Sequence, residues 1–312
     1  MPGYDFDKRL LFFKIETTEG TDATPAAADA IVTRNLQPVN YEADTRVREI
    51  DGAYYGARPE TKTMVRGRTS FEVELTGGGA ANTVPPWMKL LRIGGMDAGT
   101  AGGSSVLQKP ISASVPSATL WDYTDTLKQP LLGARADFKM TFEDDQYPFI
   151  SMDVLGFPPS TLATDASPTT PNVSAFQTPV FVSNENTVFT LGSYAAEMRR
   201  VEIMAGSVLA PRSFVGSLDR VKYRNRIWSA TCVIKCPTLA SKDYFTNIRA
   251  GTQIPLAITH GTAAGGIIAV SAPTAQVGVI TTSDEEGDLM LNIPLRFIPT
   301  SAGNDEISIT TS

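Results

Sequence analysis

The chain of 312 residues has the length of about two domains, and its 42% hydrophobic and 19% charged residues are typical of a globular protein with a buried core. Its formal net charge of −6 argues against a protein that binds nucleic acid through a basic surface. Its apolar runs all fall short of the roughly 20 residues of a membrane helix, and residues 1–9 carry charges and aromatic rings in place of a signal-peptide pattern. We therefore expect a protein that is made in a cytoplasm and does not enter a membrane.

The first predicted elements are strands. Residues 10–15, Leu-Leu-Phe-Phe-Lys-Ile, form a short apolar run that predicts a buried strand. Residues 39–50 alternate polar and apolar side chains, which is typical of a half-exposed strand. Residues 51–64 contain two glycines and a proline and predict an excursion between strands, such as a hairpin tip.

The clearest strand covers residues 66–75. The Phe-x-Val-x-Leu spacing that begins at Phe71 predicts a packed face, and Glu72 and Glu74 fall on the opposite face. A short helix is predicted next, because the prolines at 85 and 86 are tolerated in a first helical turn and the spacing from Trp87 to Gly94 matches a helix that lies on a sheet.

The rest of the first half reads as strands. Residues 106–115 and 118–127 predict two of them, and residues 136–157 predict a hairpin that turns at 143–146. Residues 159–179 are rich in Pro, Ser, Thr and Ala with little hydrophobic pattern, which is typical of a linker.

The strand and the helix occur again 157 positions later. Phe71 matches Trp228 (228 − 71 = 157), and residues 87–94 match residues 244–251 at the same offset. One offset shared by a strand, a loop and a helix indicates an internal duplication of a unit of about 150 residues, a usual domain size.

The end of the repeat matches at a smaller offset. Residues 143–158 match residues 284–299 at 141 (299 − 158 = 141), and the Gly-rich stretch after the first helix accommodates the difference as a surface loop. The sequence therefore predicts a mainly β protein with two tandem β-sandwich or barrel domains, each flanked by one short helix. The predicted parts are a first domain, 1–158, a linker, 159–179, a second domain, 180–300, and a polar C-terminal tail, 301–312.

The sequence carries no set of residues that indicates catalysis. His260 is the one histidine and has no nucleophile elbow beside it, so an ordinary strand-end or surface histidine is favoured over a catalytic one. Cys232 and Cys236 would lie about 13 Å apart in a strand, beyond disulfide reach, and the chain has no Cys/His cluster for zinc. We predict no enzyme activity, no cofactor and no metal site.

Two acidic trios and one basic stretch are candidate surfaces for docking against another subunit. The trios occupy matching hairpin turns, where a solvated tip is the alternative. The basic stretch alternates with apolar or polar residues, which favours a strand with one basic face; RNA binding is the alternative. The candidates are Glu143, Asp144, Asp145, Asp284, Glu285, Glu286, Arg220, Lys222 and Arg224.

Two other functions are open at this point. A tandem β-sandwich that binds carbohydrate or acts in adhesion is motivated by aromatic residues predicted to be exposed, namely Tyr54, Tyr55, Trp121 and Tyr123. An enzyme would need His260 or a pair of carboxylates that face each other across a cleft, and adjacent acids at a hairpin tip do not fit that geometry.

The order of strand, helix, strands and closing hairpin in both halves resembles the tail tube, or major tail, proteins of long-tailed bacteriophages. The resemblance is carried by the hairpins at 138–158 and 279–299, by the opening Phe-Lys-Ile-Glu-Thr-Thr-Glu-Gly-Thr-Asp-Ala-Thr-Pro at 13–25, and by residues 65–75. It covers essentially the whole chain.

The resemblance implies a virion structural protein of the viral tail, assembled in the cytoplasm of the bacterial host. In that family six tube domains form a ring, neighbouring sheets join into one inner barrel, and stacked rings conduct genome DNA during ejection. Two tube domains in one chain imply trimeric rings with pseudo-sixfold symmetry, with a hexamer as the alternative. The implied partners are further copies of the chain, the tail length-setting protein, and the tail terminator and baseplate proteins.

DNA would pass through the lumen of such a tube without specific binding, since an acidic wall repels phosphates. The resemblance does not say which acids line the lumen. By strand alternation, Glu42, Glu72 and Glu74 are the lumen-facing candidates.

Overall fold

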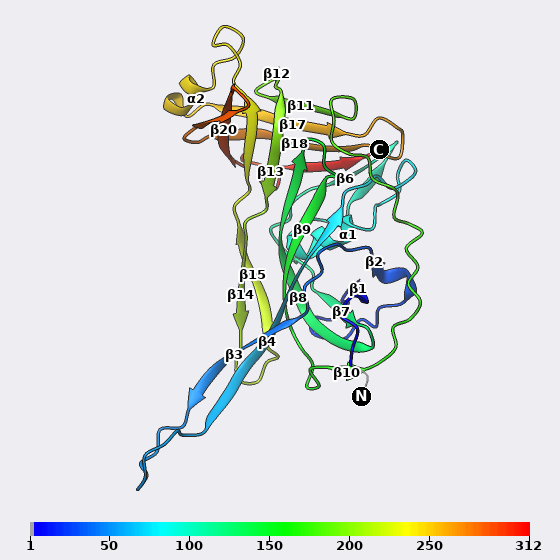
Figure 1. The fold of residues 1–312 in the computed structure, drawn as a ribbon, viewed down its shortest axis with the longest axis vertical. Helices are drawn as coiled ribbons and strands as arrows, with labels where there is room; N and C mark the ends of the chain where they lie inside the picture. The colour runs from blue at the N-terminus through cyan, green and yellow to red at the C-terminus, as the bar shows by residue number, and fades with distance from the viewer. Residues whose placement is uncertain (1–2) are drawn as a thin grey trace.

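The structure, a computed structural model, describes residues 3–312; Met1 and Pro2, which open the first predicted domain, lie outside the described residues. Among the described residues the chain is mainly β with two short α-helices, as predicted (Figure 1). The strands are β1 (Arg9–Ile15), β2 (Ala30–Ile31), β3 (Asn40–Val47), β4 (Glu60–Glu74), β5 (Thr100–Gly102), β6 (Ser105–Gln108), β7 (Ala118–Thr124), β8 (Leu127–Glu143), β9 (Phe149–Phe157), β10 (Thr164–Asp165), β11 (Thr187–Leu191), β12 (Tyr194–Ala195), β13 (Met198–Met204), β14 (Ser207–Arg212), β15 (Arg220–Arg226), β16 (Ser229–Lys235), β17 (Gln253–His260), β18 (Ile268–Val277), β19 (Thr281–Glu285), β20 (Asp288–Phe297) and β21 (Ser308–Thr311). The helices are η1 (Ala27–Asp29), α1 (Met88–Leu91), η2 (Arg92–Gly94) and α2 (Phe245–Ala250).

The strands of the first half pair in one antiparallel series. β1 pairs with β2 and β7, and the series continues through β8, β9 and β4 to β3. The alternation predicted for β4 is confirmed, since Phe71, Val73 and Leu75 are buried while Glu72 and Glu74 are partly exposed.

The strands of the second half pair in the same order. β11 pairs with β12 and β17, and the series continues through β18, β20 and β16 to β13. The matching hairpin turns also share their backbone conformation, because Asp145 and Glu286, which are 141 positions apart (286 − 145 = 141), have positive φ values of 60° and 52°. This left-handed conformation is uncommon outside glycine, so its recurrence at one offset ties the sequence repeat to the geometry.

The two halves are joined edge to edge. The end of β8 pairs with β13 in a register that runs from Arg200 opposite Glu143 to Met204 opposite Lys139. As a result, one sheet continues from β3 through β4, β9, β8, β13 and β16 to β20 and β19.

The last residues of the chain are a strand, where the sequence led us to expect a polar tail. Within 301–312, β21 pairs with β18 of the second half and with β6 of the first. Ile307 and Ile309 are fully buried. The short Ser-Ile-Thr-Thr stretch offers too weak a pattern to predict a strand, and it becomes one because two strand edges lie on either side of it.

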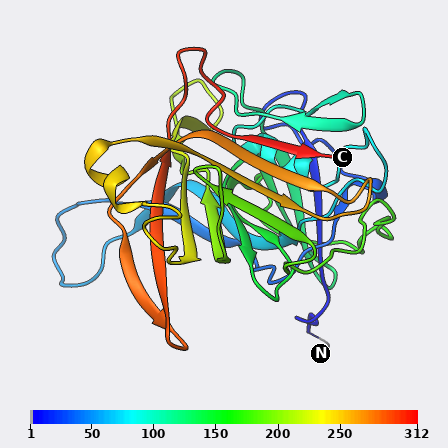
Figure 2. The ribbon, with the colours of Figure 1, turned by 90° about the horizontal axis from the view of Figure 1, so that it is seen from above.

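Residues 159–179 run along the outside of the first half, at the right of Figure 1, and include the two-residue strand β10, which pairs with Leu127 and Lys128 of β8. Seen from above, the orange β19–β20 hairpin stands out from the body of the molecule (Figure 2).

The two predicted helices form, but their surroundings differ. The apolar residues of α1 and η2 are buried, and Trp87 just before them donates from Nε1 to the carbonyl of Thr76 at 2.7 Å. Tyr244 holds the corresponding place before α2 and donates to the carbonyl of Leu191 at 2.9 Å. Every residue of α2 itself, however, is partly or fully exposed. Each helical segment ends at a glycine in the left-handed conformation, Gly95 and Gly251.

Candidate assembly surfaces

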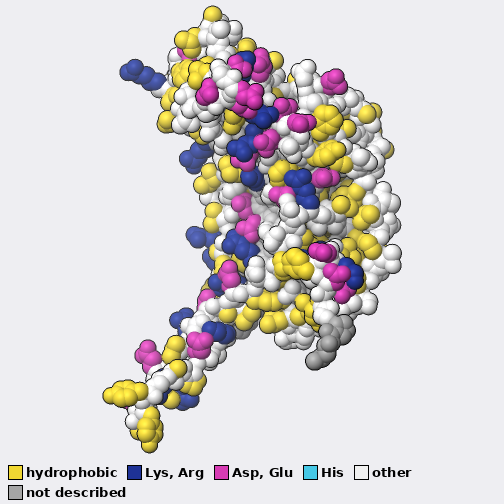
Figure 3. Space-filling view, viewed as in Figure 1, with side chains coloured by type: hydrophobic (Ala, Val, Ile, Leu, Met, Phe, Trp, Pro, Cys, Tyr) yellow, Lys and Arg dark blue, Asp and Glu magenta, His cyan; other side chains and the backbone are white. Residues whose placement is uncertain are grey.

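The continuous sheet has one polar face that crosses from the first half to the second. Residues directly opposite each other in neighbouring strands point to the same side of a sheet. One such row runs from Glu72 through Ser151 and Lys139 to Met204, and therefore joins β4, β9, β8 and β13. Figure 3 shows basic and acidic side chains intermixed along the length of the molecule.

The three predicted lumen residues belong to this polar face. Glu42 lies opposite Arg66, which shares a face of β4 with Glu72 and Glu74. Two of the three acids are neutralised within the chain: Arg66 Nε donates to Glu42 at 3.0 Å, and Arg34 Nε donates to Glu72 at 2.8 Å.

This face also carries basic residues that were not among the candidate site residues. Lys139 donates to Glu202 at 2.9 Å across the β8–β13 junction, and Arg68 binds Asp153 through two hydrogen bonds of 2.7 and 2.6 Å. These partners come from strands far apart in sequence, so only the alternation of charged residues in each strand could have suggested them. The face is consequently of mixed charge and not simply acidic.

The two acidic trios meet at one arginine. Arg199, next to the β8–β13 junction, binds Asp144 of the first trio at 3.1 Å and Glu285 of the second at 2.9 Å. Glu143 lies within the junction, where its partner in the register is Arg200. The structure therefore brings one member of each predicted trio together inside a single chain, while Asp145, Asp284 and Glu286 are exposed.

The predicted basic strand is β15, and its two faces differ as expected. Arg220, Lys222 and Arg224 are exposed, whereas Val221 is fully buried and Tyr223 is partly buried against the first half. The acid nearest to Arg220 is Glu19 of the same chain, at 3.9 Å.

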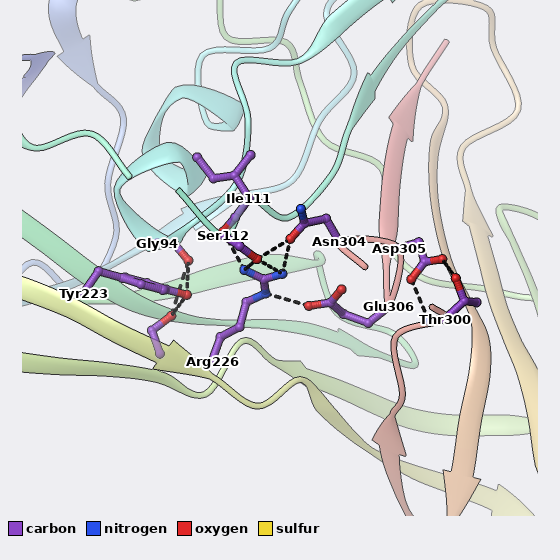
Figure 4. A network of polar contacts seen from close by, with 10 residues as sticks. Gly94, Ile111, Ser112, Tyr223, Arg226, Thr300, Asn304, Asp305 and Glu306 are labelled. Carbon is purple, nitrogen blue, oxygen red and sulfur yellow. Dashed lines mark hydrogen bonds and ion pairs between the residues drawn. The ribbon is translucent and has the colours of Figure 1, made fainter. Parts of the chain in front are cut away.

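A further basic residue of β15, Arg226, holds the two halves together (Figure 4). Its guanidinium donates to Glu306 at 2.6 Å, to Asn304 at 2.7 Å and to the carbonyl of Ile111 at 2.5 Å. Both charged side chains are nearly buried, with 11% of Arg226 and 6% of Glu306 exposed. No local pattern indicated this pair, because its two residues are 80 positions apart and meet only in the folded chain.

His260 ends β17 as a buried residue, so the expected strand-end position is correct and surface exposure is not. Its Nδ1 lies 2.9 Å from Thr187 Oγ1 and its Nε2 lies 3.1 Å from the carbonyl of Val180. Burial lowers the pKa of His260. Both ring nitrogens are thus occupied by structural contacts.

Cys232 and Cys236 are unbridged thiols in the described chain, and burial raises the pKa of Cys232.

The four aromatic residues considered for carbohydrate binding differ in exposure. Tyr54 and Tyr55 are exposed at the tip of the β3–β4 hairpin, whereas Tyr123 is buried and Trp121 is covered by Lys128, whose Nζ lies 3.1 Å from the ring centre.

Over residues 3–312 we find no helix with the length and apolarity to cross a membrane. The same residues contain no cluster of three or more His, Cys, Asp or Glu side chains suited to a metal ion.

A family model described as phage tail tube protein matches residues 7–310, which is nearly the whole chain. The chain belongs to the phage tail tube family. This family consists of structural proteins of the virion tail and is not an enzyme family. None of the curated proteins matches the chain. Membership of the tail tube family agrees with the strand-rich fold and supports a structural role in the virion tail tube.

Proposed function

We propose that this tail tube protein assembles as rings of three chains, in which the two halves of each chain occupy adjacent positions of a pseudo-sixfold ring. The observation that carries the proposal is the β8–β13 junction, where two halves with the same strand order are joined as neighbours in one sheet. Repeating that junction between chains would extend the sheet around a closed ring, and closed rotational symmetry makes such an assembly finite.

Open strand edges are available for the repeated junction. Within residues 3–312, β19 pairs with β20 alone and corresponds by the 141 offset to the end of β8. At the other end of the sheet, Arg34 forms an isolated bridge with Glu72 of β4, in the place that β13 takes beside β16. Pairing these edges between chains would protect hydrogen-bonding groups that otherwise invite uncontrolled association.

We infer that the polar face described above lines the lumen, with Glu42, Glu72 and Glu74 among its acids. Because its charges are mixed and paired within a protein of net charge −6, this face would let DNA pass without binding its phosphates tightly. The tail length-setting protein inside the tube, and terminator and baseplate proteins at its ends, are the remaining proposed partners. Assembly would take place in the host cytoplasm and would involve no catalysis.

We also propose domain limits of 1–158 and 180–300, with 159–179 as the linker. The β21 strand modifies this division, because it adds to the second domain and contacts the first. The exposed acids Asp145, Asp284 and Glu286 and the bases Arg220, Lys222 and Arg224 stay candidates for contacts between subunits.

The test is electron microscopy of the purified protein with rotational averaging, combined with the mass of single rings. Three chains and six similar lobes in a hollow ring are expected. Six chains in each ring would agree with a role in the tail tube but would contradict the trimeric ring. Isolated two-lobed particles under all conditions, with no tubes in lysates, would refute the proposal.

A further inference from the structure

The β14–β15 hairpin leaves the second half and lies on the first. The backbone N–H of Ser207 donates to Asp137 at 2.7 Å, and the hydroxyl of Tyr223 donates to the carbonyl of Gly94 at 3.2 Å. Arg135 donates to the carbonyl of Val221, whose side chain is fully buried. The hairpin thus covers the C-terminal end of the first helical segment and the adjoining part of β8.

The β3–β4 hairpin is the counterpart of this element in the first half, and its outer part projects into solvent without packing on another part of the chain. It connects the same positions of the strand series, and in Figure 1 it projects from the body at the lower left. Tyr54 at its tip is 86% exposed and Tyr55 is fully exposed, and Figure 3 shows apolar side chains at the end of this projection. Exposed aromatic residues at the end of a long unsupported hairpin are typical of a contact that forms on association.

The surface of the second half that matches the covered site is bare as well. Its helix, α2, has no buried residue, whereas Met88, Leu90 and Leu91 of α1 are buried. Phe138, which lies beneath the β14–β15 region and packs on Trp228, is buried, but its match at the 141 offset, Val279, is 74% exposed (279 − 138 = 141). The β3–β4 hairpin therefore covers no surface of its own chain, and the matching surface of the second half is covered by no hairpin.

We propose that the β3–β4 hairpin of one copy docks on the second half of a neighbouring copy, over the C-terminal end of α2 and Val279. The occupant is a second copy of this chain, because the contact repeats the one that β14–β15 makes within the chain. Figure 1 places α2 and the β3–β4 hairpin at opposite ends of the molecule, so a chain cannot supply its own hairpin. The inference rests on the proposed ring and adds a second contact to the joined sheet.

The 157 offset of the repeat selects the position for a test. Met64 in β4 of the first hairpin matches the fully buried Val221 in β15 of the second (221 − 64 = 157). A photocrosslinking amino acid at Met64, activated in assembled tubes, is expected to link to residues 245–251 or 276–280 of another copy, as mapped by mass spectrometry.

Crosslinks to other regions in tubes that still form would overturn this inference and leave the proposed function intact. A wild-type protein that forms no rings or tubes would overturn both.

A substitution on the docking site gives an independent readout. Val279→Asp is expected to abolish ring formation while the monomer keeps its circular dichroism spectrum and urea midpoint. The matched control is Val188→Asp, at a 63% exposed valine on β11, which is expected to form rings normally. Rings formed equally by both variants would refute the docking site, and a loss of rings in both would show that the effect is not specific to it.

Discussion

Removing the guanidinium of Arg226 should destabilise the chain more than most single substitutions. In Arg226→Ala, the carboxylate of Glu306 would remain nearly buried without its partner at 2.6 Å, and Asn304 and the carbonyl of Ile111 would lose their donor. Breaking a buried ion pair from one side typically costs about 3–5 kcal/mol, whereas an exposed pair contributes about 0–1 kcal/mol. With 11% and 6% of the two side chains exposed, the pair belongs to the first class.

The assay is urea unfolding followed by circular dichroism, with the midpoint and the slope fitted for each variant. We expect Arg226→Ala to lower the free energy of unfolding by about 3–5 kcal/mol at an unchanged slope. The double variant Arg226→Met/Glu306→Leu should lose less than the sum of the two single variants, because it leaves no charge unpaired. A loss below about 1 kcal/mol in Arg226→Ala would refute the reasoning, since that is the range of a solvated pair.

Three further predictions concern two buried titratable groups and the two glycines that end the helical segments. Burial raises the pKa of Asp122 to about 6, against the opposing influence of Arg9 at 3.5 Å; the folded state then holds a proton that the unfolded chain has lost, so stability should fall as the pH rises from about 4 to about 6. Urea midpoints of Asp122→Asn should lack this fall, and an identical pH profile in the variant would contradict the assignment. Burial lowers the pKa of His260, so its protonation opposes folding and stability should drop as the pH falls below about 6.5; His260→Gln should remove this acid sensitivity in thermal melts, and an unchanged sensitivity would exclude His260 as its source. In Gly95→Ala, at a φ of +92°, the new Cβ would lie 2.5 Å from the hydroxyl of Tyr223, whereas in Gly251→Ala, at a φ of +63°, the nearest atom would be 3.6 Å away. Both should lose about 1–2 kcal/mol from the left-handed backbone, with a larger loss for Gly95→Ala; equal losses by urea unfolding of the monomer would show that the β14–β15 hairpin does not press on Gly95.

Local periodicity was enough to predict the elements whose neighbours are close in sequence. The alternation around Phe71 predicted which face of β4 is buried and which is partly exposed, because successive side chains of a strand point to opposite sides whatever its partners are. The stripe from Trp87 to Gly94 and the glycines after it gave the helical segment and its end. Hairpins such as β8–β9 also follow from the sequence, since the turn and both strands lie within one short stretch.

The candidate surfaces were only partly predictable. The sequence located the acidic trios and the basic face of β15, because clusters of one charge stand out in a linear reading. It could not show that Arg199 binds one acid from each trio, or that Arg34 and Arg66 neutralise two of the supposed lumen acids. Ion pairs between distant strands depend on register, and register is a property of the whole sheet.

The sequence by itself determined the strands and helices that have a clear local pattern, such as β4 and α1, and it contains that pattern twice, because backbone propensity and side-chain alternation act over a few residues. Only the tertiary structure decided how the repeats meet: β8 against β13, β21 between β18 and β6, and β14–β15 over the first helix while β3–β4 stays bare. These arrangements pair strand edges and apolar surfaces that lie far apart along the chain. Each segment is compatible with several partners, and the choice is made by which packing closes the most edges and buries the most apolar surface at once.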